Sequence, residues 1–373
     1  MAAPASRTTC RTLLRTSKRS FTRSTRASSS SSSSSTPSTS SSSSSSSWQP
    51  LLKPGVLPAY DEALSYLSSQ SAALRSRIAS LEQTHPDLPA SELAQLRESL
   101  EIAARINDPA TLAAFQSSSA THYDASNPAF RHLRERLWRK DSGVLAKVIE
   151  RCTLMHVLPD VLPGITPTAD VQLAFGQGEG FTDHASTGGD VLVGVFVDPS
   201  VTLEPPTVEV NVFHTETKRY TLAIVDPDQP DEEAQTFRTS LLALKTDIEL
   251  SATSDPKVDL THGMQVAYVP PHPQQGTKYH RYTTVLFEQP QQASEAQAVH
   301  DRHNFSVADF AQSRGLVPAG IHFWRAQWSP ECAPTVSKIY TDILKTREPK
   351  YTKPPTLDKV RKQIGDIGSK WFS

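Results

Sequence analysis

The sequence predicts a mainly β protein, in which one antiparallel β-sandwich or barrel-like domain carries an α-helical N-terminal extension and a basic C-terminal tail. From about Asp170 the chain consists of short apolar or alternating runs separated by Pro, Gly and Asp clusters. This pattern is typical of antiparallel strands and not of alternating strand–helix units. The runs are VQLAF, VLVGVFV, VEVNVF, YTLAIV, MQVAYV and YTTVLF. Before this point the apolar residues follow a helical period.

The N-terminal 47 residues differ in composition from the rest of the chain. Residues 1–26 contain seven Lys or Arg and no acidic residue, and the first acid is Asp61. This pattern predicts a mitochondrial transit peptide, with a disordered basic tail as the alternative. Residues 28–47 are almost pure serine, which favours a flexible spacer. We therefore expect segment boundaries at 1–47, 48–152, 153–345 and 346–373.

The charge balance limits the classes of partner. The full chain has a formal net charge of −1, and without the seven basic residues of 1–26 it has 31 Lys/Arg against 39 Asp/Glu, or −8. Because phosphate binding depends on Lys and Arg, an acidic body of this kind is not expected to be coated with nucleic acid, and any RNA contact is local. No apolar run reaches 18 residues, so no membrane span is expected.

The cysteine and histidine pattern predicts neither a disulfide framework nor a metal site. The three cysteines are Cys10, Cys152 and Cys332, without a CxxC pair, as expected in a reducing compartment. His300 and His303 have no matching pair of ligands nearby, so we expect no metal and no other cofactor.

A heptad pattern predicts a helical hairpin over residues 60–106. The first seam steps by four and three residues through Tyr60, Leu64, Leu67, Ser71, Leu74, Ile78 and Leu81. After THPDLP the spacing continues through Leu93, Leu96, Leu100 and Ala103, and the hairpin stops at Asn107-Asp108-Pro109. The pair either buries only its own seam or binds a partner.

A third helix is expected over residues 128–151, with an apolar stripe of Phe130, Leu133 and Leu137. The basic residues, with Trp138 among them, then point away from this stripe, and such a mixture suits phosphate contact and base stacking. A solvated face is the alternative. The residues predicted to contact RNA or a protein partner, here and in the basic tail, are Arg131, Arg134, Arg136, Trp138, Arg139, Lys140, Lys353, Arg361 and Lys362.

A series of motifs resembles the phosphatidylethanolamine-binding protein (PEBP) family. They are VLPDVLPGITPTADVQLAF, DPDQP at 226–230, Gly276-Thr277 followed by His280-Arg281-Tyr282, Phe287-Glu288-Gln289, and FAQSRGLVPAGIHFWRAQW. They occur in order over roughly residues 155–345. The resemblance implies a PEBP-like β-sandwich with an anion pocket, to which Asp226, Asp228, His280 and Tyr282 correspond.

Two walls of the implied pocket depart from the family pattern. By register, Thr239 stands where a second histidine is expected, and a hydroxyl replaces a donor that can be charged. The Gly-rich loop reads YVPPHPQQGT, where proline removes backbone donors. We therefore expect a vestigial pocket, in which Arg281 forms a structural ion pair with Asp226 or Asp228. A retained anion site is the alternative.

No motif predicts catalysis. The chain lacks GxSxG and HExxH, and GQGEG at 176–180 is followed by polar loop and not by a helix, so it fails the dinucleotide-binding context. We expect a protein that is not an enzyme and has no small-molecule substrate.

The presequence, helical extension, eroded pocket and basic tail together resemble the branch of the PEBP family, of fungal type, that belongs to the mitochondrial large ribosomal subunit. This resemblance implies a structural ribosomal protein in the mitochondrial matrix, with large-subunit rRNA and neighbouring ribosomal proteins as partners. The alternatives are a soluble mitochondrial PEBP-type protein that binds phospholipid or anions or regulates a protease, and a transient assembly factor.

Overall fold

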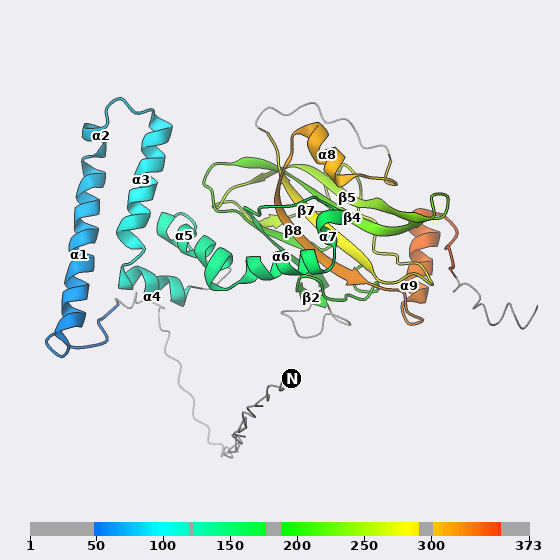
Figure 1. Ribbon diagram of the computed structural model, residues 1–373, viewed down its shortest axis with the longest axis horizontal. Coiled ribbons are helices and arrows are strands. Elements are labelled where there is room, and N and C mark those ends of the chain that lie inside the picture. The colour runs from blue at the N-terminus through cyan, green and yellow to red at the C-terminus, as the bar shows by residue number, and fades with distance from the viewer. Residues whose placement is uncertain (1–47, 119–122, 177–187, 291–300, 352–373) are drawn as a thin grey trace, which may run out of the picture. The chain divides into compact units, whose positions relative to one another are not determined.

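The computed structural model describes residues 48–118, 123–176, 188–290 and 301–351 (Figure 1). The predicted transit peptide and serine spacer, and the tail beyond residue 351, lie outside these ranges. The described residues form a helical N-terminal part and a β domain built from two sheets.

The helical part begins with the hairpin that the heptad spacing predicts. Helix α1 (Pro58–Ala79), the short α2 (Leu81–Thr84) and α3 (Ala90–Arg105) form it. All seven positions of the first predicted seam are at least partly buried. The prediction of the second seam is wrong at its last position, because the predicted Ala103 is exposed and its neighbour Ala104 is buried. Each helix therefore contributes one apolar stripe to the contact between them.

The hairpin ends before Pro109, as predicted, and a further helix begins at Pro109. Helix α4 (Pro109–Ser117) has Pro109 at its first position, and the Asp108 side chain accepts a hydrogen bond from the N–H of Ala110. Proline is tolerated at the first position of a helix because an N–H group there would have no hydrogen-bond partner inside the helix. The same residues that stop α3 therefore begin α4.

The third predicted helix is not continuous. Helix α5 (Pro128–Arg136) continues as a π-helical turn at Leu137–Asp141, breaks, and is followed by α6 (Val144–Leu154). Gly143 at the break has φ = +66°, in the left-handed region that favours glycine. The prediction of one helix over 128–151 is therefore wrong.

The β domain contains two four-stranded sheets, each with antiparallel pairing between its strands. The first has the order β2 (Gly188–Val191), β1 (Asp170–Gly176), β3 (Thr207–Asn211) and β6 (Lys257–Val258). The second has the order β5 (Thr236–Leu250), β4 (Lys218–Asp231), β7 (His280–Glu288) and β8 (Val317–Ala326).

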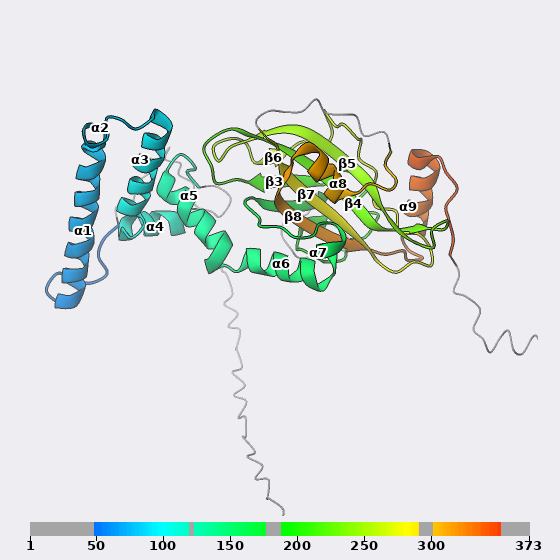
Figure 2. The same ribbon diagram turned by 45° about the horizontal axis from the view of Figure 1, so that its top comes forward.

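The second sheet is buried on both faces. Leu222 and Ile224 of β4 pack in the core shared with the first sheet, whereas Ala223 and Val225 face a second core beneath α7 (Val157–Asp160) and α8 (Val307–Arg314) (Figure 2). Strands covered on both faces carry near-continuous apolar runs. This burial explains why the runs YTLAIV and YTTVLF do not alternate.

The chain beyond β8 forms α9 (Ala333–Lys338) and a π-helical turn at Ile339–Leu344. Val336 and Tyr340 are buried there together with Cys332. Tyr340 thereby reaches the polar network of the β domain described below.

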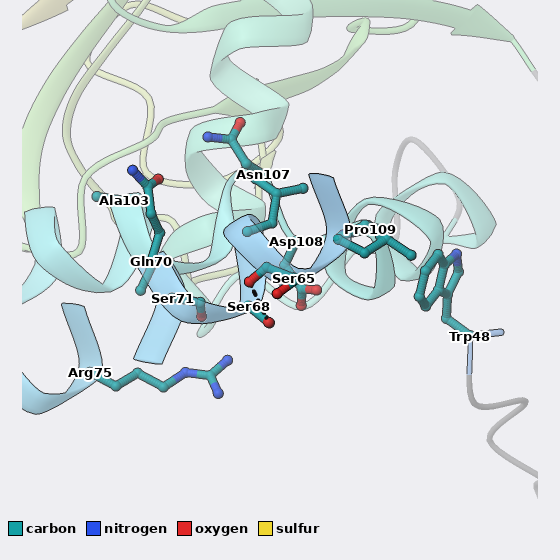
Figure 3. Close-up of a pocket in the computed structure, with 13 residues that line it drawn as sticks. Trp48, Ser65, Ser68, Gln70, Ser71, Arg75, Ala103, Asn107, Asp108 and Pro109 are labelled. Carbon is teal, nitrogen blue, oxygen red and sulfur yellow. Dashed lines mark hydrogen bonds between the residues drawn. The ribbon is translucent and has the colours of Figure 1, made fainter. Parts of the chain in front are cut away.

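Ser71 interrupts the apolar seam of the hairpin beside a cavity of about 460 Å³ (Figure 3). Its buried hydroxyl has no hydrogen-bond partner among the described residues. We expect Ser71→Ala to stabilise the hairpin by about 1 kcal/mol, because the change removes an unsatisfied buried polar group. Amide hydrogen exchange of α1 and α3 in the full chain measures this effect.

Ser69→Ala is the matched control, because Ser69 lies on the exposed side of the same helix and gains the same helix propensity. If Ser71→Ala protects these amides no better than Ser69→Ala does, the hydroxyl of Ser71 is satisfied and the prediction fails.

Candidate functional site

The four residues predicted to line an anion pocket come together where β4 and β7 lie side by side. Asp226 and Asp228 belong to β4, and His280 and Tyr282 belong to β7. His280 Nδ1 lies 2.8 Å from Asp226 Oδ2, and both side chains are buried. The other oxygen of Asp226 accepts a hydrogen bond of 3.0 Å from the N–H of Asp228. The centre of the site is thus a buried carboxylate–imidazole pair.

This pair is held in its ionised form. Burial alone raises the pKa of Asp226, but the charge and hydrogen bond of His280 outweigh it and keep that pKa below its usual value. Burial opposes the charge of His280 as well, and Asp226 outweighs it, so the pKa of His280 is raised. Nε2 of His280 lies 3.0 Å from the hydroxyl oxygen of Thr277, which accepts a hydrogen bond from the second N–H of the charged ring.

Side chains of the Pro-rich segment fill the space beside the pair. Gln229 Nε2 lies 3.2 Å from Asp226 Oδ2, and Gln274 Nε2 donates to Gln229 Oε1 at 2.6 Å. His272 Nε2 lies 3.3 Å from Gln229 Nε2, and its ring meets Tyr340 edge-on at 5.3 Å. Asp226 is therefore surrounded by donors from the chain itself. The sequence marks this segment only by proline and glutamine where small residues are expected.

Arg281 forms the structural ion pair that the sequence predicts, with Asp228. Its Nε and Nη2 donate to the two oxygens of Asp228 at 2.8 and 2.6 Å, and Nη1 donates to Asp160 at 2.8 Å. Nη1 also donates to the carbonyl oxygens of Met155 and His156. Arg281 thus joins strands β4 and β7 to the segment around α7.

Tyr282 is a packing residue of the core. It is fully buried, and its ring is stacked between those of His280 at 6.1 Å and Trp324 at 5.8 Å.

Thr239, which is predicted to stand where the family has a second histidine, lies next to the residue that pairs with Asp226. Ser240 lies across from Asp226 in the β4–β5 pairing and is buried, whereas Thr239 accepts a hydrogen bond from the N–H of Phe305 through its carbonyl oxygen. A register shift follows Asp226 in this pairing, and sequence spacing alone does not reveal it.

A cavity of about 480 Å³ opens beside the polar network, next to Gln229, Ser240, His272 and Gln274. Its charged lining residues are Asp231, Glu232, Glu233, Arg238, Arg302 and Arg347. Three carboxylates offset three guanidinium groups, so the lining has no excess positive charge to attract an anion.

The residues predicted to contact RNA on α5 and the π-helical turn are mostly engaged inside the protein. Arg131 is buried, pairs with Glu98 of α3, and donates to the carbonyl oxygens of Ala125 and Ser126. Trp138 is buried, and its ring centroid lies 5.5 Å from that of Phe213. The prediction that these side chains point outward is wrong for both.

The neighbouring basic residues differ in exposure. Arg134 is nearly buried, 4.0 Å from Asp170, and Arg139 binds Glu135 at 2.7 Å and the Pro167 carbonyl at 3.1 Å. Arg136 pairs with Asp141 but is half exposed, and Lys140 is exposed. The remaining predicted residues, Lys353, Arg361 and Lys362, lie outside the described residues.

Within residues 48–118, 123–176, 188–290 and 301–351, no group of three His, Cys, Asp or Glu is arranged to hold a metal ion. No helix in these ranges is long and apolar enough to cross a membrane.

Residues 174–324 match the family model described as phosphatidylethanolamine-binding protein, so the chain carries a domain of this family. Large ribosomal subunit protein mL38 of Schizosaccharomyces pombe is 26% identical over 301 residues, which cover 76% of this chain and 93% of that protein. An alignment of 301 residues is longer than the β domain, so the similarity includes residues of the extensions.

Two solved structures show a likeness to the β domain. Carboxypeptidase Y inhibitor, solved in complex with its cognate proteinase, is 18% identical and has a TM-score of 0.41, with 49% of this chain and 96% of that chain covered. The phosphatidylethanolamine-binding protein of Plasmodium vivax is 18% identical and has a TM-score of 0.36, with 48% and 97% covered.

We expect Asp226→Asn to destabilise the β domain by about 3 kcal/mol, because it leaves the buried His280 without its counter-charge. Urea unfolding followed by tryptophan fluorescence measures the loss. Asp160→Asn is the matched control, since Asp160 is 45% exposed and Arg281 keeps Asp228 as a partner, so the expected loss is below about 1 kcal/mol. Equal losses in the two variants would show that the Asp226 pair is not essential.

We expect the free energy of unfolding to fall as the pH drops from 6.5 to 4.5. His322 is buried with Nε2 3.0 Å from the Val191 carbonyl, and burial lowers its pKa to about 4. In the unfolded chain a histidine with a pKa of about 6.5 takes up a proton in this window that native His322 does not. Burial lowers the pKa of His272 as well, with an effect of the same sign.

His322→Gln should therefore reduce the loss at pH 4.5 by about 2 to 3 kcal/mol. His280 acts in the opposite direction, because its raised pKa contributes stability that is present below pH 6.5 and is lost at higher pH. Urea unfolding at a series of pH values tests this, with the exposed His85→Gln as control. An unchanged pH slope in His322→Gln contradicts the prediction.

Proposed function

We propose that this protein is a structural constituent of the mitochondrial large ribosomal subunit. The observation that supports this most directly is the similarity to a large ribosomal subunit protein over 93% of that protein's length, which includes residues outside the PEBP domain. The Arg-rich, acid-free N-terminus supports a mitochondrial matrix location. A PEBP domain alone would be expected to have neither the similarity outside the domain nor this basic N-terminus.

In this proposal the PEBP domain acts as a non-enzymatic scaffold with a vestigial pocket. Asp226 and His280 neutralise each other, Asp228 is bound to Arg281, and Tyr282 is packed between two rings. Gln229 and Gln274 satisfy the remaining polar atoms around the pair that an anion would otherwise meet. The four residues then have an architectural role, and no small-molecule substrate is required.

The helical hairpin is the proposed protein-docking element. No residue of α1 is buried, and the segment that precedes it exposes Leu51 (92%), Val56 (64%) and Leu57 (49%). Exposed apolar residues that gather on one segment often mark an interaction surface. The cavity between α1 and the turn before α4, with Trp48 at its edge, offers a recess for a partner side chain (Figure 3). A neighbouring ribosomal protein is the proposed occupant.

The proposed rRNA contacts from the predicted set are the exposed Lys140, the half-exposed Arg136, and Lys353, Arg361 and Lys362 of the tail. Arg131 and Trp138 support the docking of α5 and the π-helical turn within the protein instead.

A PEBP-type anion binder is the second candidate, and the cavity of about 630 Å³ lined by Thr277, Lys278 and His280 favours it. Titration of the purified chain with phosphoethanolamine, followed through the His280 imidazole resonances, separates the two. A saturable shift below 1 mM, as an order of magnitude for a specific site, would favour the binder.

Sucrose-gradient sedimentation of mitochondrial lysate tests the proposed function. A C-terminally tagged full chain should migrate with the large ribosomal subunit and remain there after a high-salt wash, because buried protein contacts are not screened as phosphate contacts are. Migration only at the top of the gradient would contradict the proposal. Loss by salt alone would instead favour a transient assembly factor.

The same gradient tests the hairpin contact. A variant that lacks residues 58–105 should leave the subunit while the PEBP domain stays folded, as near-ultraviolet circular dichroism of the buried Trp324 and Tyr282 would show. Normal incorporation of this variant would exclude the hairpin as the docking element.

A further inference from the structure

A cluster of two exposed aromatic rings and one arginine lies on the β domain, away from the predicted basic helix. Arg325 lies over the ring of Phe196 at 4.1 Å and 5.2 Å from the ring centroid of Tyr279. The two rings are 5.8 Å apart and nearly perpendicular. Phe196 is 42% exposed and Tyr279 is 37% exposed. We call Phe196, Tyr279 and Arg325 the aromatic cluster.

Backbone hydrogen bonds hold this cluster in place. The segment 194–197 runs along β8: Gly194 N–H donates to the Phe323 carbonyl at 2.7 Å, and Val197 N–H donates to the Arg325 carbonyl at 2.8 Å. Gly194 has φ = +75°, and a Cβ there would lie 3.0 Å from the Phe323 ring, so the turn that presents Phe196 requires glycine. The Nε of Arg325 donates to the Gly194 carbonyl at 2.8 Å. The rings and the guanidinium are thus preorganised on paired strands.

The cations around the cluster are not neutralised by carboxylates. Arg325, Lys278 and Arg151 have no ion pair with any residue in the described ranges, and Arg151 donates to the Val193 carbonyl, next to Gly194. Lys278 is exposed and precedes Tyr279. The carboxylates of Asp160 and Asp228 in the adjoining cavity are both bound to Arg281. This surface therefore presents three cations that have no carboxylate partner in the described ranges, on a protein whose body is acidic.

An isolated exposed ring needs no explanation, because apolar atoms form much of any protein surface. Here two rings enclose a guanidinium whose Nη groups have no carboxylate partner in the described chain, and a cavity of about 630 Å³ lies beside Tyr279. Guanidinium groups bind phosphate, and exposed aromatic rings stack on unpaired bases. An acidic peptide would engage the cations but would leave the rings without a planar partner.

We infer that the aromatic cluster binds single-stranded RNA, with a phosphate on Arg325 and a base stacked on Tyr279 or Phe196. This inference rests on the proposed ribosomal function, for which it names a contact surface that the sequence does not predict. Lys278, which precedes Tyr279, and Arg151, which donates to the Val193 carbonyl, would supply further phosphate contacts.

Ultraviolet crosslinking of the purified full chain to a uridine decamer tests the inference, with crosslinked peptides identified by mass spectrometry. A crosslink in the peptides that contain Tyr279 or Phe196 is expected, and its yield against RNA concentration gives the Kd of this site alone. Arg325→Gln should raise that Kd about tenfold, through the lost charge-assisted phosphate contact. Lys278→Gln should reduce the slope of log Kd against log salt concentration by about one, the value for one phosphate contact.

Arg75→Gln is the matched control, because Arg75 is an exposed arginine on α1, and it should leave the Kd unchanged. If Arg325→Gln unfolds the domain, Tyr279→Leu serves instead, since it keeps an apolar side chain and removes the stacking ring. Its expected effect is also a rise in Kd of about tenfold. This Kd is measured from the yield of the remaining Phe196 crosslink against RNA concentration.

Absence of crosslinks at these peptides would overturn the inference, as would an equal effect of Arg75→Gln. Polyglutamate that competes as strongly as the RNA would also overturn it and would indicate a protein partner. Sedimentation of the chain with the large subunit is a separate measurement, so a failed crosslink with normal sedimentation rejects the RNA site and leaves the proposed function intact.

Discussion

The buried ion pair between Asp226 and His280 is the interaction on which the arrangement of the PEBP domain depends. Burying two opposite charges is costly unless the remaining hydrogen-bond positions are filled, and here they are filled by Thr277, the N–H of Asp228, and Gln229. Asp228 and Gln229 belong to β4, whereas Thr277 lies in the loop before β7. The pair therefore fixes how the segment 269–277 folds back against β4, and that segment in turn carries His272 and Gln274 into the space beside the pair.

A second, more exposed ion-pair group links this centre to the rest of the domain. Arg281 binds Asp228 of β4 and Asp160 of α7, and it also caps two carbonyl oxygens of the chain before α7. Because α7 and α8 cover one face of the second sheet, the same arginine contributes to closing the core that makes β4 and β7 apolar on both faces. A residue that an anion-binding protein could use for its ligand is here fully engaged in holding two layers together.

The surfaces left over from this internal pairing explain the proposed function better than the pocket does. The segment before the hairpin exposes apolar residues, and α1 buries none of its own. The aromatic cluster presents one arginine, without a carboxylate partner in the described chain, between exposed rings. By contrast, the basic helix that attracts attention in the sequence uses Arg131, Arg139 and Trp138 to attach itself to neighbouring segments. A scaffold whose central charged groups are paired inside, and which carries exposed apolar and cationic groups at its surface, suits a protein that is one part of a large assembly.

The sequence by itself determined the features that depend on short-range periodicity and residue type. The heptad seam of α1, the stop at Pro109, the β character after Asp170 and an ion pair of Arg281 with Asp226 or Asp228 all follow from spacing, backbone restriction and charge. Only the tertiary structure decided the features that depend on which segments meet. It buried Arg131 and Trp138, paired Asp226 with Ser240, and placed Phe196 beside Arg325, which is 129 positions away in the chain. The physical reason is that side-chain exposure and strand register are set by long-range packing. The identity of a basic or β-branched residue does not show which segments it will pack against.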